Sequence, residues 1–426
     1  MSKRTSTARS IPGPEVALFA CDVAKDKVDL YTQIAGRDVE RCINSRAVAL
    51  ETQLTTLASL ARQNGAQRVV VLAEPTGCYH EPLLRAAQRL GLETAWVSGE
   101  AVAKMRVVEF NDTGKTDLKD PRVIYTLGRM GKTLVHRPLE EPYSLLREWN
   151  SLYDASDVRV VEIKGAIHIE LHDLFPDFSF KTDFLYGRGG QALLKHYCLN
   201  PYRIVEAGFE AFSARIRKAY PTIRKSSLAR LFQDAESSVR TALSPRRAEL
   251  REFRLRQLWQ DWEREQERKL LAKQAMENLY AEARHLDPRL PEGQKGVVTN
   301  FHLARIVGET GPLSDFASWR KLLRYAGLNL RERQSGRYRG KTRISKKGRT
   351  LLRKILSQTV LPLVKGTCLF GPYYHKKREE GRMPGAKAMT VVMRKFLKML
   401  FGWYRAGDAF QAERVFQCES IFRKAA

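Results

Sequence analysis

Four carboxylates in this chain lie in sequence contexts that could support metal-dependent chemistry. Asp22 and Glu74 each follow an apolar run, in ALFACDVAKDK and VVVLAEPTG, and Asp117 and Asp120 lie three residues apart in GKTDLKDP. Two-metal phosphodiester cleavage uses converging carboxylates, which hold hard cations that activate the attacking oxygen and stabilise the leaving oxygen. The pattern predicts such a site, with Mg²⁺ as the expected cation and Mn²⁺ as its substitute.

The geometry of the aspartate pair depends on Pro121, which directly follows Asp120. Proline is compatible with the first turn of a helix but not with its interior. A helix therefore begins near Asp117, which places both carboxylates on one face, or it begins only at Asp120, with Asp117 in the preceding loop. The simpler interpretation of any single acid is a surface charge or an N-cap, although surface charge is less expected directly after an apolar strand.

One hydroxyl, Ser335, lies in the most basic stretch of the chain. Residues 320–354 contain 14 Lys and Arg but a single acid, Glu332, which is typical of a surface that binds a phosphate backbone. A serine here could attack phosphorus, with arginines neutralising the developing charge. Composition alone favours an ordinary loop serine, and no general base is evident. Ser345 is expected to cap the helix that follows. The cations predicted to bind nucleic acid are Arg331, Arg333, Arg337, Arg339, Lys341, Arg343, Lys346, Lys347 and Arg349.

Alternating strand and helix patterns must position the first two acids. The spacing of apolar residues predicts strands at 16–21, 28–34, 68–73 and 93–97, and helices at 46–64 and 80–90. A hairpin followed by β-α-β alternation indicates an α/β fold with a mixed sheet flanked by helices. Asp22 and Glu74 then lie at strand ends, where sites form in such sheets.

The remainder of the chain is predicted to be mainly helical. Residues 244–286 form a helical hairpin or coiled-coil arm, or equally an amphipathic helix packed on its own domain, because the apolar seam is imperfect. The expected organisation is a basic tail at 1–14, a mixed-sheet domain at 15–142, a helical region at 143–287, a linker at 288–296 and a C-terminal domain at 297–426. Within that last domain, residues 330–343 form a basic loop or hairpin, and helices span 345–364 and 386–404.

Composition indicates an intracellular protein that binds polyanions. The net charge of +27 favours nucleic acid over a membrane surface. We find no apolar run long enough to span a membrane and no signal peptide, so a cytoplasmic location is expected. The six cysteines are widely scattered, which indicates neither disulfides nor structural zinc.

The motifs together resemble the IS110 family of insertion-sequence transposases over nearly the full length. CDVAKDKVDLY, AEPTGCYHEPL and KTDLKD are similar to its RuvC-like domain, whose acidic tetrad corresponds to Asp22, Glu74, Asp117 and Asp120. YAGLNLRERQSGRYRGKTRISKKGRTLLRK resembles its C-terminal transposase domain, whose catalytic serine corresponds to Ser335. The segment GQKGVVTNFHLARIVGETG, at 293–311, departs from the family's glycine-rich hairpin segment, and Pro121 replaces its usual alanine.

The resemblance implies site-specific recombination of donor and target DNA, directed by a structured bridge RNA. It also implies a covalent serine intermediate, Mg²⁺ held by the tetrad, and a homo-oligomer from dimer to tetramer that acts on the bacterial nucleoid. A metal-dependent nuclease or junction resolvase would need the acids but not Ser335. A nucleic-acid-binding protein without catalysis would tolerate loss of the acids as well.

Overall fold

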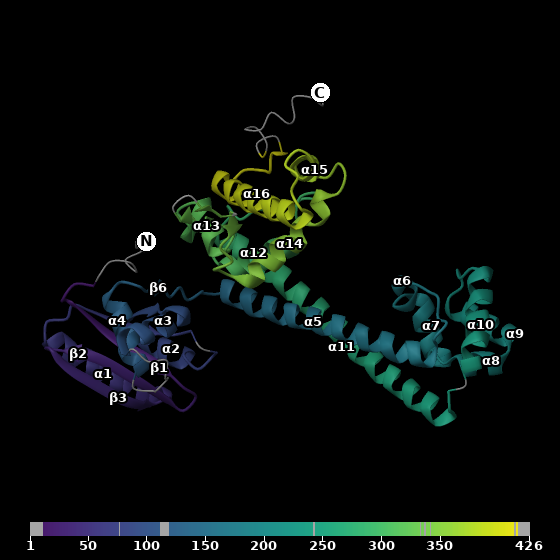
Figure 1. The fold of residues 1–426 in the computed structure, drawn as a ribbon, viewed down its shortest axis with the longest axis horizontal. Helices are drawn as coiled ribbons and strands as arrows, with labels where there is room; N and C mark the ends of the chain where they lie inside the picture. Colours follow the sequence, from purple (N-terminus) through teal and green to yellow (C-terminus); the bar gives the residue numbers. More distant parts are fainter. Residues whose placement is uncertain are drawn as a thin grey trace. The chain divides into compact units, whose positions relative to one another are not determined.

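The computed structural model describes residues 12–75, 77–110, 119–241, 243–332, 334–335, 338–340, 342–412 and 415. The chain divides into two compact units between Pro138 and Leu139 (Figure 1). Each unit is described by itself below. Among the helices in the described part of the chain, none combines the length and apolar character that a membrane crossing requires.

The N-terminal unit is built on a six-stranded mixed sheet with the order β3-β2-β1-β4-β5-β6. Its central strand β1 pairs antiparallel with β2 and parallel with β4, and β4 pairs parallel with β5. The mixed sheet predicted from the sequence is confirmed, and β3 and β6 are additional to the prediction. The strands are β1 (Val16–Val23), β2 (Lys27–Ile34), β3 (Arg37–Asn44), β4 (Arg68–Ala73), β5 (Glu93–Trp96) and β6 (Leu134–Val135).

Helices cover both faces of this sheet. Alternate residues of β1 enter two separate cores, with Phe19 and Cys21 on one side and Leu18 and Ala20 on the other. The first side packs against α1 (Ala47–Gln63) and α2 (Glu81–Arg89), and the second packs against α3 (Gly99–Phe110) and α4 (Lys119–Arg129). This alternation decides which helices face each functional side chain.

Two long helices dominate the first half of the second unit. They are α5 (Tyr143–Leu174) and α11 (Pro245–Leu286). Asp157 pairs with Lys269 whereas Glu170 pairs with Arg251, so the two helices run antiparallel. Between them in sequence lie α6 (Thr182–Leu185), α7 (Arg188–Tyr197), α8 (Pro201–Ala207), α9 (Phe209–Ala219), α10 (Lys225–Ser238) and the 3₁₀ turn η1 (Val239–Thr241).

The C-terminal part is mainly helical and encloses a large apolar core. Leu290 is 2% exposed in that core, so the predicted linker at 288–296 contributes to the packing. The helices are α12 (Asn300–Thr310), α13 (Trp319–Tyr325), α14 (Thr350–Val360), α15 (Gly371–Glu379) and α16 (Gly385–Ala406), with 3₁₀ turns η2 (Leu313–Asp315) and η3 (Pro362–Val364). Four short strands complete this part: β7 (Leu330–Arg331), β8 (Gln334–Ser335), β9 (Tyr338–Arg339) and β10 (Arg343–Ile344).

The start of α14 differs from the prediction. The helix begins at Thr350 rather than near 345, and Ser345 does not cap it. Lys346 has a φ of 56° and Gly348 a φ of 155°, which no right-handed helix contains. Gly348 lies against the backbone of Tyr325, where a Cβ would clash with the carbonyl oxygen. The close approach of two backbone segments therefore delays the helix.

Candidate active site

Asp22 and Glu74 lie at the same edge of the central sheet. Cys21 in β1 lies opposite Ala73 in the parallel strand β4, so the next residue of each strand is one of these acids. The carboxyl ends of neighbouring parallel strands form a shared edge on which binding sites are commonly built. Asp22 is partly buried there, as is Glu74.

Both acids also belong to the same face of the sheet. Cys21 and Ala73 contribute to the core beneath α1 and α2, so their successors point to the opposite face, toward α3 and α4. The carboxylate of Glu74 occupies the space that a Cβ of residue 99 would need. Gly99, the first residue of α3, therefore leaves room for this carboxylate between the sheet edge and the helix.

Asp120 lies in the first turn of α4 and faces the same layer. Val123 and Ile124, one turn later, pack on the sheet, and Asp120 shares their stripe of the helix. Asp120 is only 3% exposed. Arg106 of α3 holds one carboxylate oxygen, with Nε 2.7 Å and Nη2 2.6 Å from Oδ1. Three of the four predicted acids are thus directed toward the layer between the sheet and these helices.

The donor chemistry of this layer fits a hard divalent cation. Carboxylate oxygens are the ligands that Mg²⁺ prefers, and a buried carboxylate already matched by an arginine shows that the layer accommodates opposite charges. Within the described residues no three acidic, histidine or cysteine side chains are gathered as a ready metal site. The remaining acid, Asp117, lies outside the described residues. Cys21 is no ligand candidate, because burial and the charge of Asp22 raise the pKa of its thiol.

The ion pair between Arg106 and Asp120 supplies a test of this layer. We expect Arg106→Gln to lower the free energy of opening of α4 by about 3 kcal/mol without metal, because Asp120 is left buried without its cation. Hydrogen exchange of the α4 amides, measured by mass spectrometry in chelator, checks this. Lys104→Gln on the same helix removes an exposed pair with Glu100 and should leave the exchange nearly unchanged. Equal protection in both variants would contradict the buried pair.

Ser335 lies near the turn of a nested hairpin. The outer ladder pairs Leu330 with Ile344, and the inner ladder pairs Ser335 with Tyr338. The serine is exposed. Of the predicted nucleic-acid set, Arg331, Arg343, Lys346 and Lys347 are exposed, Arg339 has only its backbone described, and Arg333, Arg337 and Lys341 lie outside the described residues.

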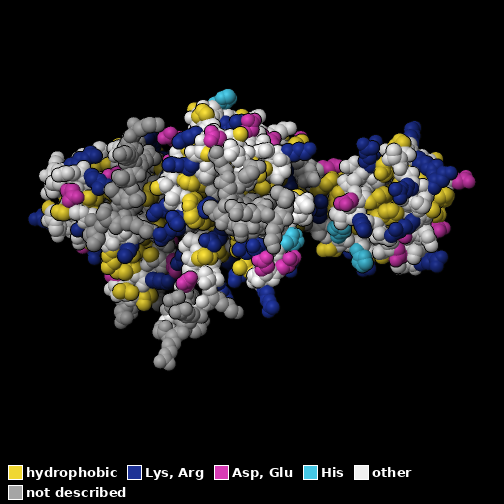
Figure 2. Space-filling view, turned by 90° about the horizontal axis from the view of Figure 1, so that it is seen from above, with side chains coloured by type: hydrophobic (Ala, Val, Ile, Leu, Met, Phe, Trp, Pro, Cys, Tyr) yellow, Lys and Arg dark blue, Asp and Glu magenta, His cyan; other side chains and the backbone are white. Residues whose placement is uncertain are grey.

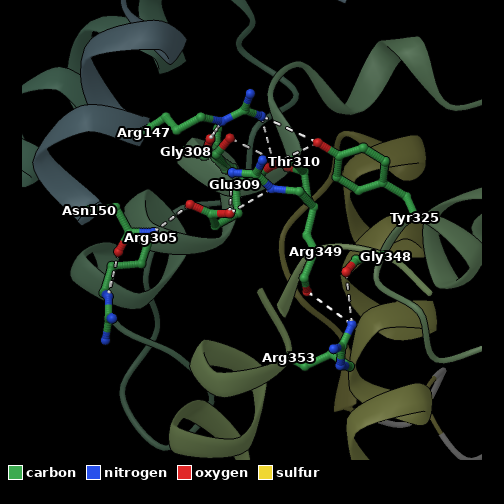
Figure 3. Close-up of polar contacts among 11 residues, drawn as sticks. Arg147, Asn150, Arg305, Gly308, Glu309, Thr310, Tyr325, Gly348, Arg349 and Arg353 are labelled. Atoms are coloured by element: carbon green, nitrogen blue, oxygen red, sulfur yellow. Dashed lines mark hydrogen bonds and ion pairs between the residues drawn. The ribbon is translucent and has the colours of Figure 1, made fainter. Parts of the chain in front are cut away.

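The base of this hairpin is fixed by a polar network (Figure 3). Glu309 of α12 is 1% exposed and accepts from Nε and Nη2 of Arg349 at 3.0 and 2.8 Å. The same carboxylate accepts from Asn150 of α5 at 3.1 Å, and Arg147 donates to the carbonyl oxygen of Glu309 at 2.9 Å. Ser345 donates to Asn329 at 2.6 Å. Arg349 therefore has a structural role that its place in the basic stretch did not indicate.

The role of Arg349 can be separated from phosphate binding. We expect Arg349→Gln to lower the free energy of unfolding of the C-terminal part by about 2–3 kcal/mol, because Glu309 stays buried without its cation. Arg343→Gln, on an exposed neighbour in the same stretch, should change it by less than about 0.5 kcal/mol. Denaturant titration followed by circular dichroism measures both. A larger loss of stability in Arg343→Gln than in Arg349→Gln would contradict the structural role of Arg349.

Sequence reasoning did not identify Arg106, Asn150 or Glu309. Arg106 belongs to no motif, and its sequence signal is only that a cation lies in the segment between the predicted acids Glu74 and Asp117. Glu309 carries a stronger signal, because it ends the apolar run of α12, where a charge must find a buried partner. The divergent segment at 293–311 forms this buried helix, capped by Thr299, which accepts from the amide of His302.

Comparisons with protein-family models place both candidate groups inside matched stretches. Residues 19–176 match the DEDD transposase model of the IS110 type, and residues 298–375 match the model described as transposase IS116/IS110/IS902 family. The first stretch contains the four acids and the second contains Ser335, and together they cover more than half of the chain. No curated protein matches the chain significantly.

Proposed function

Because the chain belongs to the IS110 family of transposases, we propose that it recombines DNA through a covalent bond between Ser335 and a DNA phosphate. The family is one of DNA transposases, so the protein is a DNA recombinase. The domain that contains its predicted acids, within residues 19–176, depends on a divalent cation. The observation that carries this proposal is that Asp22, Glu74 and Asp120 all face the layer between the sheet and the helices α3 and α4.

The proposed reaction has two balanced steps. In the first, the Ser335 Oγ attacks a DNA phosphorus, the serine–phosphate bond forms, and the bond to a sugar oxygen breaks. The hydroxyl proton leaves and the departing sugar oxygen gains a proton. In the second step, the free hydroxyl of another DNA end attacks the same phosphorus, which rejoins the strand and releases the serine. No external energy source is required, because the number of phosphodiester bonds is conserved.

The chain's own residues have defined roles in this scheme. Exposure of Ser335 near the turn of its hairpin lets a duplex backbone approach the hydroxyl. The exposed cations Arg331, Arg343 and Lys346 neutralise phosphate charge near the hairpin, and the Glu309 network keeps its base in place. Mg²⁺ held by Asp22, Glu74, Asp117 and Asp120 would supply positive charge that stabilises the developing oxyanion.

We further propose that a structured guide RNA selects the DNA sequences. Support comes from the net charge of +27, which exceeds what a single short DNA contact requires. Backbone contacts by lysine and arginine carry little sequence information, so base pairing with RNA would supply the choice of site. The working form is expected to be an oligomer, from dimer to tetramer, on nucleoid DNA in the bacterial cytoplasm.

The proposal is tested by incubating the purified protein with labelled DNA ends, co-purified RNA and Mg²⁺. The expected product is a protein–DNA adduct that survives a denaturing gel and is digested by protease. Cleaved DNA without any adduct would instead identify a metal-dependent nuclease that does not use Ser335. Binding without cleavage under any divalent cation would identify a nucleic-acid-binding protein.

A further inference from the structure

A helical module of this chain lies outside both family matches. Residues 177–297 separate the two matched stretches, and α6 to α10 within them share one apolar core with the adjoining parts of α5 and α11. Leu193, Phe212 and Leu228 are completely buried in that core. We call residues 177–241 the tip module, because they connect the far ends of α5 and α11 (Figure 1).

The tip module is firmly held on the two long helices. Tyr186 stacks on Trp259 of α11 with ring centroids 5.5 Å apart, and it also contacts Trp262 at 5.1 Å. The Tyr186 hydroxyl donates to the carbonyl oxygen of Lys164 of α5 at 3.4 Å, and within the module Asp234 of α10 accepts from both the amide and the hydroxyl of Ser179. Because the module has a packed core and fixed contacts, charged groups on its surface keep a defined arrangement.

Five cations gather at one end of this module. They lie within residues 215–225, a run that contains no acid. Two are in the last turn of α9, and two are at the N-cap and first residue of α10. The connecting loop is short and is anchored by Ile223, which is buried, so the two helix ends stay together. We call this group the cation cluster; its members are Arg215, Arg217, Lys218, Arg224 and Lys225.

Arg215 lies over the ring of Tyr197, 5.8 Å from its centroid, whereas the other four cations form no ion pair or ring contact among the described residues. Nearby arginines pair with acids, as Arg251 does with Glu170 and Arg203 with Glu252. Among the described residues, no member of the cation cluster forms an ion pair with a carboxylate. Arg224 and Lys225 also lie at the N-terminal end of α10, where positive charge opposes the helix dipole at a cost of a few tenths of a kcal/mol or more.

The surroundings extend the positive surface. Lys195 at the end of α7 is exposed, and His196 beside it has its pKa lowered by burial and by the charges of Lys195 and Arg215. Lys and Arg side chains are visible over the lobe that the tip module forms in the space-filling view (Figure 2). The positive charge therefore comes from three helices, α7, α9 and α10.

We propose that the cation cluster of the tip module binds the phosphate backbone of duplex DNA. Duplex DNA is the polyanion on which this transposase acts, and its closely spaced phosphates match a group of cations that have no carboxylate partners among the described residues. Binding of single strands usually depends on exposed aromatic rings that stack on bases. The aromatic residue in the run 215–225, Tyr220, instead packs against the core that the module shares with α5 and α11. Contacts of long cationic side chains with phosphates position DNA without reading its sequence.

The test compares DNA binding by two charge-matched variants of the full-length protein. One replaces the whole cation cluster with glutamine. The other replaces five exposed arginines of the N-terminal unit, on or next to the α1 and α2 side, and keeps the cation cluster. Fluorescence anisotropy with a short duplex of arbitrary sequence gives affinity at several salt concentrations. The control substitutions are Arg41→Gln, Arg46→Gln, Arg62→Gln, Arg85→Gln and Arg89→Gln.

We expect the cluster variant to bind duplex DNA at least about tenfold more weakly at moderate salt. Its slope of log affinity against log salt should fall by about three to five, roughly one for each lost phosphate contact. Circular dichroism and thermal unfolding verify that the fold is intact. A smaller variant with only Lys218, Arg224 and Lys225 replaced, all exposed, should show about half of the effect if the full variant folds poorly.

Two results would overturn the proposal. Equal affinities and slopes for the cluster variant and the control would show that net charge alone matters. Loss of affinity for an RNA duplex with unchanged affinity for the DNA duplex would assign the cation cluster to RNA. Neither readout depends on catalysis, so a failure here is distinguishable from a failure of the proposed serine chemistry.

Discussion

Ser335→Ala is expected to abolish the covalent protein–DNA adduct and to reduce strand joining by at least about a thousandfold, because it removes the nucleophile of the proposed step. DNA and RNA binding should stay within about twofold, since one exposed hydroxyl contributes little to a broad basic surface. The measurement is a denaturing gel with labelled DNA ends, guide RNA and Mg²⁺, run beside an anisotropy titration of the same variant.

Ser345→Ala is the matched control for this experiment. It removes a hydroxyl from the same basic stretch. Ser345, however, is less exposed than Ser335 and donates to Asn329 at the base of the hairpin. We expect this variant to keep the adduct, with a modest loss of stability. Persistence of the adduct in Ser335→Ala would remove Ser335 from the reaction, and loss of nucleic-acid binding would give it a structural role.

The sheet and the positions of its two acids were predictable because local sequence determines them. The apolar runs of β1 and β4 are buried on both faces, and such strands are recognisable without knowledge of their partners. An acid that directly follows such a run must lie at the strand end. Because successive side chains of a strand point to opposite faces of the sheet, Asp22 and Glu74 then lie on one face, provided that the two strands are neighbours.

Edge strands were less predictable. In β3 only one residue, Ile43, is buried, so the strand carries almost no apolar alternation. Its pairing with β2 is specified by the hairpin turn after Ile34, where Ala35 and Gly36 both adopt positive φ. Strand β6 has only two residues, both exposed, and depends on β5 for its existence. Tertiary contacts, rather than local pattern, produce these strands.

The charge partners of the site were not predictable because they join distant segments. Glu309 meets Arg349 and Asn150 only after α5, α12 and the hairpin have packed together. In the sequence, Arg349 looks the same as its basic neighbours. The basic stretch was therefore interpreted as one surface, whereas the structure separates an internal cation from the exposed ones. The start of α14 was missed for a related reason, the approach of Gly348 to Tyr325.

Asp22→Asn is expected to reduce DNA cleavage and strand joining by at least about a thousandfold. The substitution preserves size but replaces one acceptor oxygen with an NH2 donor and removes the charge that a hard divalent cation requires at this edge of the sheet. Raising the concentration of Mg²⁺, or replacing it with Mn²⁺, should not restore activity, because the ligand itself is lost. Single-turnover cleavage of labelled DNA ends, followed over a range of both cations, measures the effect.

Asp26→Asn distinguishes this loss from a general effect of charge near β1. Asp26 lies in the turn between β1 and β2 and is exposed, so its removal changes net charge by the same amount at a nearby position. We expect near-normal cleavage from Asp26→Asn, because its side chain lies on the turn rather than on the face shared by Glu74 and Asp120. Full activity of Asp22→Asn would exclude Asp22 from metal binding, and equal losses in the two variants would indicate an electrostatic effect on DNA binding. A selective loss in Asp22→Asn, with unchanged DNA affinity, ties the chemistry to the layer between the sheet and α4.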